Sequence, residues 1–237
     1  MFEELLIRPL YNGFVFLIDI VPGGEVGLAI ILLTLIVRAV FYPAFAASIR
    51  TQIAMSAIQP EVDEINRKYK DDTQERARRT MALFKEKKVR PLAGLLALLV
   101  QIPIFIALYF VFFREGLPNI EMDLLYSFVS VPAIVQTNFF GFVDLLANHN
   151  IFLAALVGGT QYLVTKLSLA RTPKRTGASP EVEMTHKLQR SLMLYMLPGL
   201  MTVLTYTFPA GVGLYFLTGN VVSLAQEFYI KRQNHFT

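Results

Sequence analysis

Cysteine is absent from this 237-residue chain, which excludes disulfide bonds, thiolate metal sites and a lipidated cysteine. Histidine is scarce, and His149, His186 and His235 lie in different segments outside the long apolar stretches. The zinc motif HExxH, the nucleophile motif GxSxG and a glycine-rich phosphate loop are all missing. The sequence therefore gives little support to an intramembrane enzyme, and we expect no cofactor and no metal.

Charge is also missing over long distances, although 54% of the residues are hydrophobic. Uncharged runs of this length predict an all-α polytopic membrane protein. One uncharged run, 191–226, would be about 54 Å long as a single helix, so we divide it at the turn signal Phe208–Gly211. The result is five expected transmembrane helices, at 27–47, 92–113, 151–167, 191–207 and 211–228.

The basic residues are divided unequally between the two sides that these spans define. With the N-terminus outside, the inner segments carry 19 Lys and Arg and the outer segments carry two. Such a bias follows the positive-inside rule. It favours five spans with the C-terminus in the cytoplasm, because four spans or the opposite orientation would leave basic segments outside.

The residues between the spans predict four further parts. Residues 1–25 read as an interfacial amphipathic segment, although a degenerate signal segment is the alternative. Residues 114–150 are rich in Phe, and we expect interfacial helices there. Residues 170–189 contain two prolines and predict a cytoplasmic loop, and 231–237 form a short basic tail.

The inner segment 49–90 predicts a cytoplasmic helical hairpin. Apolar residues recur at helical spacing on both sides of 70–73, and they are Val62, Ile65 and Tyr69, then Ala77, Met81 and Phe84. Asp72 followed by Glu75 is a capping-box signature for the second helix, and Pro60 fits the first turn of the first helix. The hairpin is either a docking or gating element or a charged spacer between two spans.

Arg38 is the only charge within 27–47. A guanidinium near the bilayer midplane costs at least about 2.5–3.5 kcal/mol, so it marks a functional site by default. The spans carry one carboxylate, Glu227, close to the cytoplasmic end of the last one. The neighbours open to Arg38 are therefore neutral, namely Thr34, Gln101, Gln161, Tyr162, Thr165, Tyr215 and Asn220. We expect a hydrated, positively charged groove, because snorkelling from mid-span would require a reach of about 15 Å.

Four segments resemble signatures of the YidC/Oxa/Alb membrane insertase family. They are LTLIVRAVFYP at 33–43, MALFKEKKVRPLAG at 81–94, QIPIFIALY at 101–109 and FPAGVGLYFLTGN at 208–220. The resemblance implies five helices around a hydrophilic groove that is closed on the outer side, in the bacterial plasma membrane. It implies insertion of membrane proteins without nucleotide or metal, with Arg38 recruiting acidic client segments. Thr34, Gln101, Tyr215 and Phe216 match the family motifs and are expected to line the groove.

The implied partners are nascent membrane proteins and the lipid bilayer, with a ribosome and a Sec-type translocon as further candidates and no direct contact with nucleic acid. Two other functions stay open at this point. One is a small transporter or channel with a basic anion site, which the absence of an internal repeat disfavours. The other is a structural assembly subunit.

Overall fold

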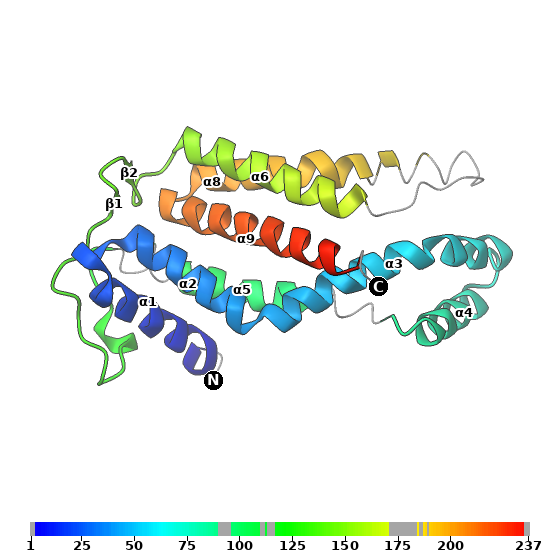
Figure 1. Ribbon diagram of the computed structural model, residues 1–237, viewed down its shortest axis with the longest axis horizontal. Coiled ribbons are helices and arrows are strands. Elements are labelled where there is room, and N and C mark those ends of the chain that lie inside the picture. The colour runs from blue at the N-terminus through cyan, green and yellow to red at the C-terminus, as the bar shows by residue number, and fades with distance from the viewer. Residues whose placement is uncertain are drawn as a thin grey trace.

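The computed structural model describes residues 3–89, 96–109, 112, 117–170, 184, 187–188 and 190–234. Long helices run along one axis, with a small β-hairpin at one end and a helical hairpin at the other (Figure 1). The N-terminal elements are η1 (Glu3–Ile7), α1 (Arg8–Ile20), η2 (Pro22–Gly24), α2 (Val26–Val40), α3 (Tyr42–Lys68), α4 (Thr73–Glu86) and α5 (Leu96–Tyr109). The others are η5 (Met122–Leu124), β1 (Asn138–Phe139), β2 (Val143–Asp144), α6 (Ile151–Ala170), η6 (Leu192–Met196), α8 (Leu197–Thr207) and α9 (Ala210–Asn234).

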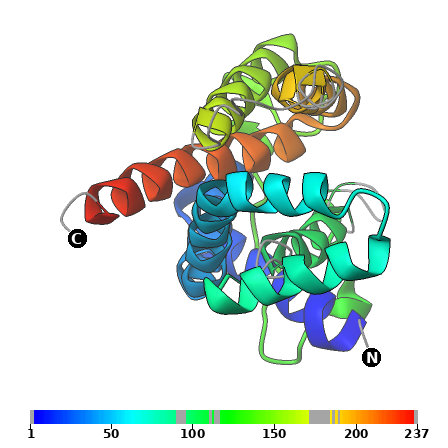
Figure 2. The ribbon, with the colours of Figure 1, turned by 90° about the vertical axis from the view of Figure 1, so that its right-hand side faces the viewer.

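Helix α9 lies in the middle of the molecule. It packs on α6 and α8 along one side and on α2 along the other. Figure 2, a view along the molecule, shows the same two groups of helices on either side of α9. The last helix of the chain therefore joins its N-terminal part to its C-terminal part.

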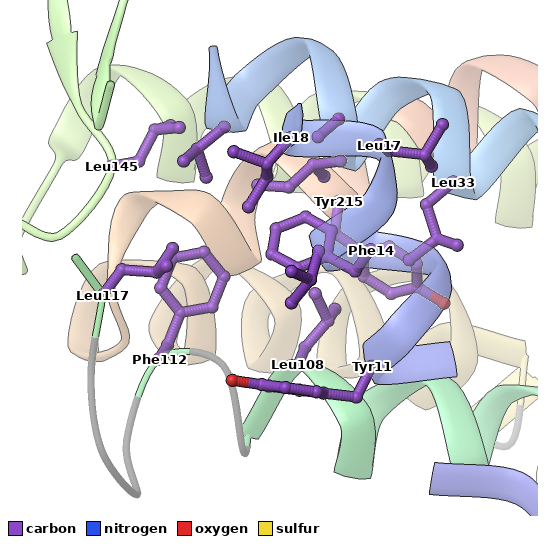
Figure 3. Close-up of a cluster of buried hydrophobic side chains, with 14 of the residues drawn as sticks. Tyr11, Phe14, Leu17, Ile18, Leu33, Leu108, Phe112, Leu117, Leu145 and Tyr215 are labelled. Carbon is purple, nitrogen blue, oxygen red and sulfur yellow. The ribbon is translucent and has the colours of Figure 1, made fainter. Parts of the chain in front are cut away.

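The main hydrophobic core is built around α1. Phe14, Val15 and Ile18 are at most 1% exposed, and they pack with side chains of α2, α5 and α9. Figure 3 shows Phe14 and Ile18 among Leu108, Phe112, Leu145 and Tyr215. One face of the N-terminal segment is thus buried in protein, and the placement of its other face in a membrane interface stays a prediction.

The expected first span, 27–47, is not one helix. Helix α2 ends at Val40, α3 begins at Tyr42, and the two axes are bent by 68°. Pro43 explains the break, because its ring excludes the carbonyl of Ala39 and it has no N–H to donate to it. Pro60 was expected in the first turn of the first hairpin helix, and this was wrong, since Pro60 lies inside the continuous α3.

The last apolar run is divided at the expected turn. Helix α8 ends at Thr207, the backbone of Phe208 is extended, and α9 starts at Ala210. The expected span 151–167 corresponds to α6. Of 92–113, α5 covers 96–109, whereas 92–95, 110–111 and 113 lie outside the described residues, as does most of the loop 170–189. Residues 231–234 of the basic tail continue α9, and 235–237 are not described.

The helical hairpin consists of the end of α3 together with α4. Its predicted cap is confirmed, because the Asp72 carboxylate accepts a 2.9 Å hydrogen bond from the Glu75 N–H. Hydrogen bonds from Arg78 and Arg79 lower the pKa of Glu75 to about 2.

The predicted apolar stripe on α4 was wrong: Met81 is 65% exposed, and Leu83 is buried instead. Leu83 lines a cleft of about 330 Å³ together with Ile65 of α3, Tyr69 at the end of that helix, and Arg79. The Arg79 guanidinium carbon lies 5.8 Å from the centroid of the Tyr69 ring.

The expected outer segment, 114–150, is not helical over most of its described length. Within 117–150 the structure contains one helical turn, η5, and the antiparallel pair β1–β2, so the expected interfacial helices were wrong there. Prolines and single glycines interrupt the Phe-rich sequence, and this favours turns over helices.

By length and composition, one helix in the described part of the chain, α6, is able to cross a membrane. The α2–α3 pair would be a second if its two bent halves form a single span. The described α5 and the combined η6–α8 helix are apolar but shorter than a full span of this kind. The structure is thus mostly helical, and helix length alone does not fix the number of spans.

Candidate functional site

Arg38 lies in the last turn of α2, just before the bend. The carbonyl groups at this helix end carry a partial negative charge, which stabilises a cation by about 0.3–1 kcal/mol at an exposed site. No ion pair in the described part of the chain involves Arg38. The charge is therefore placed at the negative end of a helix dipole rather than against a carboxylate.

An aromatic ring forms one side of the Arg38 environment. The guanidinium carbon lies 4.2 Å from the centroid of the Phe45 ring, within the range of a cation–π interaction. Phe45 belongs to the first turn of α3 and is 6% exposed. In a straight helix these two residues would be about 10 Å apart along the axis, so the bend between α2 and α3 assembles this contact.

Helix α9 forms the opposite side. A Cβ atom added at Gly219 would lie 3.3 Å from Arg38 Nη2, so the guanidinium approaches the backbone of α9 directly. Tyr215, one turn earlier on α9, is close enough to Arg38 to interact with it electrostatically. The Tyr215 hydroxyl accepts a 2.5 Å hydrogen bond from Gln101 Nε2 of α5. Three helices thus meet around the charge with neutral polar groups.

The predicted site residues separate into two sets. Arg38, Gln101 and Tyr215 come together, Phe216 contacts the Tyr215 ring at 5.4 Å between centroids, and the buried Thr34 lies one turn from Arg38. The Thr34 hydroxyl donates to the Ile30 carbonyl at 2.7 Å.

The second set belongs to the α6 side of α9. Asn220 donates to Thr160 Oγ1 at 3.1 Å and to the Val157 carbonyl at 3.4 Å. Gln161 donates to Thr165 at 3.4 Å, and the Tyr162 ring lies 6.2 Å from that of Tyr195. The Asn220 and Tyr162 contacts join α6 to α9 and to η6, on the far side of α9 from Arg38, whereas the Gln161 hydrogen bond lies within α6.

Two residues at the site were missed in the sequence. Phe45 follows Arg38 by seven positions on the same helical face, with Pro43 between them, so its position was readable in principle. The position of Gly219 beside Arg38 could not be read from the sequence, because it depends on the approach of α2 to α9. Glu227, the single carboxylate expected in the spans, is buried in α9 eight residues beyond Gly219, about 12 Å along the axis.

The outer segment closes one end of the helix bundle. Backbone hydrogen bonds join Gln136 to Gly24 and Val26, Leu145 and Ala147 to the start of α9, and His149 to Tyr206. The segment is held on α1 as well, where Arg8 and Asn12 donate to the Leu124 carbonyl at 3.1 and 2.8 Å. Toward the opposite end, at the helical hairpin, an exposed hydrogen bond of 2.8 Å from Ser168 to Gln52 links the two groups of helices.

The site offers a fixed positive charge and hydrogen-bonding groups. The described residues contain no group of three or more His, Cys, Asp or Glu arranged to hold a metal ion. The arrangement is suited to attracting an acidic or polar segment.

Comparison with known proteins identifies relatives over nearly the whole chain. A family model described as "60Kd inner membrane protein" matches residues 17–236. Proteins named "Membrane protein insertase YidC" from Francisella tularensis subsp. novicida (strain U112) and subsp. holarctica (strain LVS) are 37% identical over 215 residues. These residues are 90% of this chain and 34% of each relative, so the chain spans about a third of the length of the curated relatives it matches.

Proposed function

This chain belongs to the 60Kd inner membrane protein family, the YidC/Oxa1 family, and we propose that it inserts membrane proteins into the lipid bilayer. The observation that carries the proposal is Arg38, a charge in an apolar helix that faces Tyr215 and Gly219 of α9 without an ion pair among the described residues. A charge held in this way is available to a client.

We propose five membrane spans with the N-terminus outside and the C-terminus in the cytoplasm of a bacterial cell. The spans would be α2 with the start of α3, then α5, α6, η6–α8 and α9. Two features support this arrangement: the outer segment and the basic hairpin lie at opposite ends of the bundle (Figure 1), and the predicted inner segments carry 19 of the 22 basic residues.

We propose that the cluster around Arg38 lies in a hydrophilic groove. The closed outer end favours a groove that opens toward the cytoplasm and toward lipid. Gln161, Tyr162 and Asn220 lie on the α6 side of α9, and we propose them as groove residues that a client meets beyond the Arg38 cluster. Nascent membrane proteins are the proposed clients, with a ribosome and a Sec-type translocon as further partners.

The mechanism is physical and includes no covalent step. A polar segment that crosses hydrocarbon loses hydrogen bonds to water, and this is costly. Water in the groove would shorten that crossing, and Arg38 would attract an acidic client segment through a field that the low dielectric strengthens. The apolar helix of the client would then leave sideways into lipid.

The proposal is tested with purified protein in liposomes and two clients that differ in one property, an acidic or a neutral outer tail. We expect Arg38→Ala to reduce insertion of the acidic-tailed client most strongly, and Arg38→Lys to retain part of it, because Lys keeps the charge but loses the planar guanidinium. Insertion is measured by protease protection of the client tail.

The matched control is Arg78→Ala, which removes an exposed arginine of α4 whose side chain is 71% exposed. It should insert both clients as wild type does. If wild-type protein inserts neither client but conducts anions across the same liposomes, the chain is a channel with a basic site and the insertase proposal fails.

A further inference from the structure

The turn between β1 and β2 exposes aromatic side chains. Asn138 pairs with Asp144 and Phe139 with Val143, and the chain reverses direction through Phe140, Gly141 and Phe142. Phe140 is 59% exposed and Phe142 is 91% exposed. Exposed aromatic rings at the tip of a short hairpin are unfavourable in water, so their surroundings need an explanation.

The backbone of this turn has an unusual conformation as well. Phe140 has a φ of 47° and Gly141 a φ of 73°, the left-handed conformations of a type I′ turn. Asn and Gly suit the first of these positions, whereas a bulky side chain there is a genuine outlier. Phe140 contacts the Phe139 ring but stays 59% exposed, so packing within the described protein offsets only part of the strain. A strained and exposed aromatic residue points to a ligand outside the chain.

The turn is connected to the helix that carries Arg38. The Phe139 ring lies so close to Gly27 of α2 that a methyl group added at Gly27 would overlap it. The Phe140 ring in turn packs on Phe139, with 4.5 Å between centroids. Arg38 follows Gly27 by 11 residues, which places it about 16 Å further along α2. That distance is about half of a hydrocarbon core of roughly 30 Å.

We propose that the 140–142 turn is a lipid anchor, whose two Phe rings enter the boundary between headgroups and acyl chains of the outer leaflet and thereby set the depth of Arg38. The proposal rests on the span topology proposed above and not on the insertion activity.

A bilayer is the occupant that the structure favours. The turn leads through β2 to α6, which begins with Ile151 and Phe152, 76% and 66% exposed, so its apolar surface continues onto a proposed span. Residues 117–150 contain three acidic residues and no Lys or Arg, which leaves aromatic partitioning as the source of affinity.

The experiment uses the absence of tryptophan from the chain. Phe142→Trp creates a single tryptophan, which can be excited apart from the ten tyrosines, and the protein is placed in vesicles of phosphatidylcholine brominated at defined acyl positions. We expect the tryptophan emission to be shifted to the blue. Bromines near the headgroups should quench most of this emission, and deeper bromines should quench less. The control is Met81→Trp on α4, 65% exposed in the structure and outside the proposed spans, which should show water-exposed emission and little loss.

Two outcomes would overturn the anchor. One is Phe142→Trp emission that iodide in water quenches and bromolipid does not. The other is a blue shift that bromolipid does not quench and that depends on protein density or on added client. Such a result would place a second copy or a client on the turn.

The effect on depth is measured with Leu35→Trp, at a 44% exposed position of α2 near Arg38. Adding Phe140→Ser and Phe142→Ser should shift its quenching profile, whereas Met122→Ser, a 68% exposed residue of the same outer segment, should not. An unchanged profile would contradict depth setting. Client insertion measured in the same vesicles reports separately on the proposed function.

Discussion

At the scale of the residue, the main feature is a charge stabilised by weak and separate contacts. Arg38 has a helix end behind it, the Phe45 ring on one side and the backbone of α9 on the other. A cation–π contact contributes about 0.5–2 kcal/mol, depending on how well the cation is desolvated, so no single contact fixes the guanidinium. Such a charge is held in position but not neutralised.

We predict that Phe45 and Arg38 are energetically coupled. Phe45→Leu retains apolar volume but removes the ring face, and it should lower the free energy of unfolding by about 0.5–2 kcal/mol. In an Arg38→Met background the same change should cost less. Denaturant titration in detergent micelles of the four proteins in this double-mutant cycle gives the coupling energy, and a coupling of zero would show that the ring and the guanidinium are merely adjacent.

At the scale of the element, helices come close together where glycine allows it. Gly158 of α6 faces Thr202 of α8, and a methyl group on Gly158 would overlap the Thr202 hydroxyl. A methyl group on Gly159, the next residue, would meet no described heavy atom within 4 Å. The neighbouring glycines therefore differ in their packing, although they share one helix.

We predict that Gly158→Ala destabilises the protein by about 1–3 kcal/mol through overpacking. Gly159→Ala is the matched control and should be neutral or stabilising, because alanine is the better helix former. Adding Thr202→Ala to Gly158→Ala removes the overlapping hydroxyl and should recover part of the loss. Thermal unfolding in micelles measures all three, and equal effects of the two glycine substitutions would contradict this account of the α6–α8 contact.

The helix ends and turns show which features the sequence could predict. The break at Phe208–Pro209 and the Asp72 cap were predicted, since proline and a capping carboxylate act on their own backbone. The bend at Pro43 was missed because a continuous apolar stretch suggested a straight span. The stripe on α4 failed at Met81, because packing between α3 and α4 decides which face of α4 is buried, and that face carries Leu83. The cluster of Gln101 and Tyr215 agrees with the family motifs, but the contact at Gly219 depends on helix packing that no local pattern encodes.

At the scale of the whole molecule, the two ends differ. Backbone hydrogen bonds from the outer segment tie together the ends of α2, α8 and α9, whereas the hairpin end carries the exposed basic helix α4. The two ends of the bundle thus differ in the way that the proposed topology requires.

We predict this direction from single cysteines in the cysteine-free chain. Met122→Cys in η5 should react with a membrane-impermeant maleimide on intact spheroplasts, because it lies in the outer segment and Met122 is 68% exposed. Met81→Cys in α4, with 65% exposure, should react only after permeabilisation. Labelling is read as a mass shift on a gel, and the reverse pattern would invert the proposed topology.

The position of Gly219 and Tyr215 on the final helix has a consequence for biosynthesis. Arg38 is made 181 residues before Gly219, so at about 5–20 residues per second it waits roughly 9–36 s for the helix that covers it. During that interval the charge lies in an unfinished bundle, and the newly made protein has the same need for help at the membrane that it is proposed to meet in others.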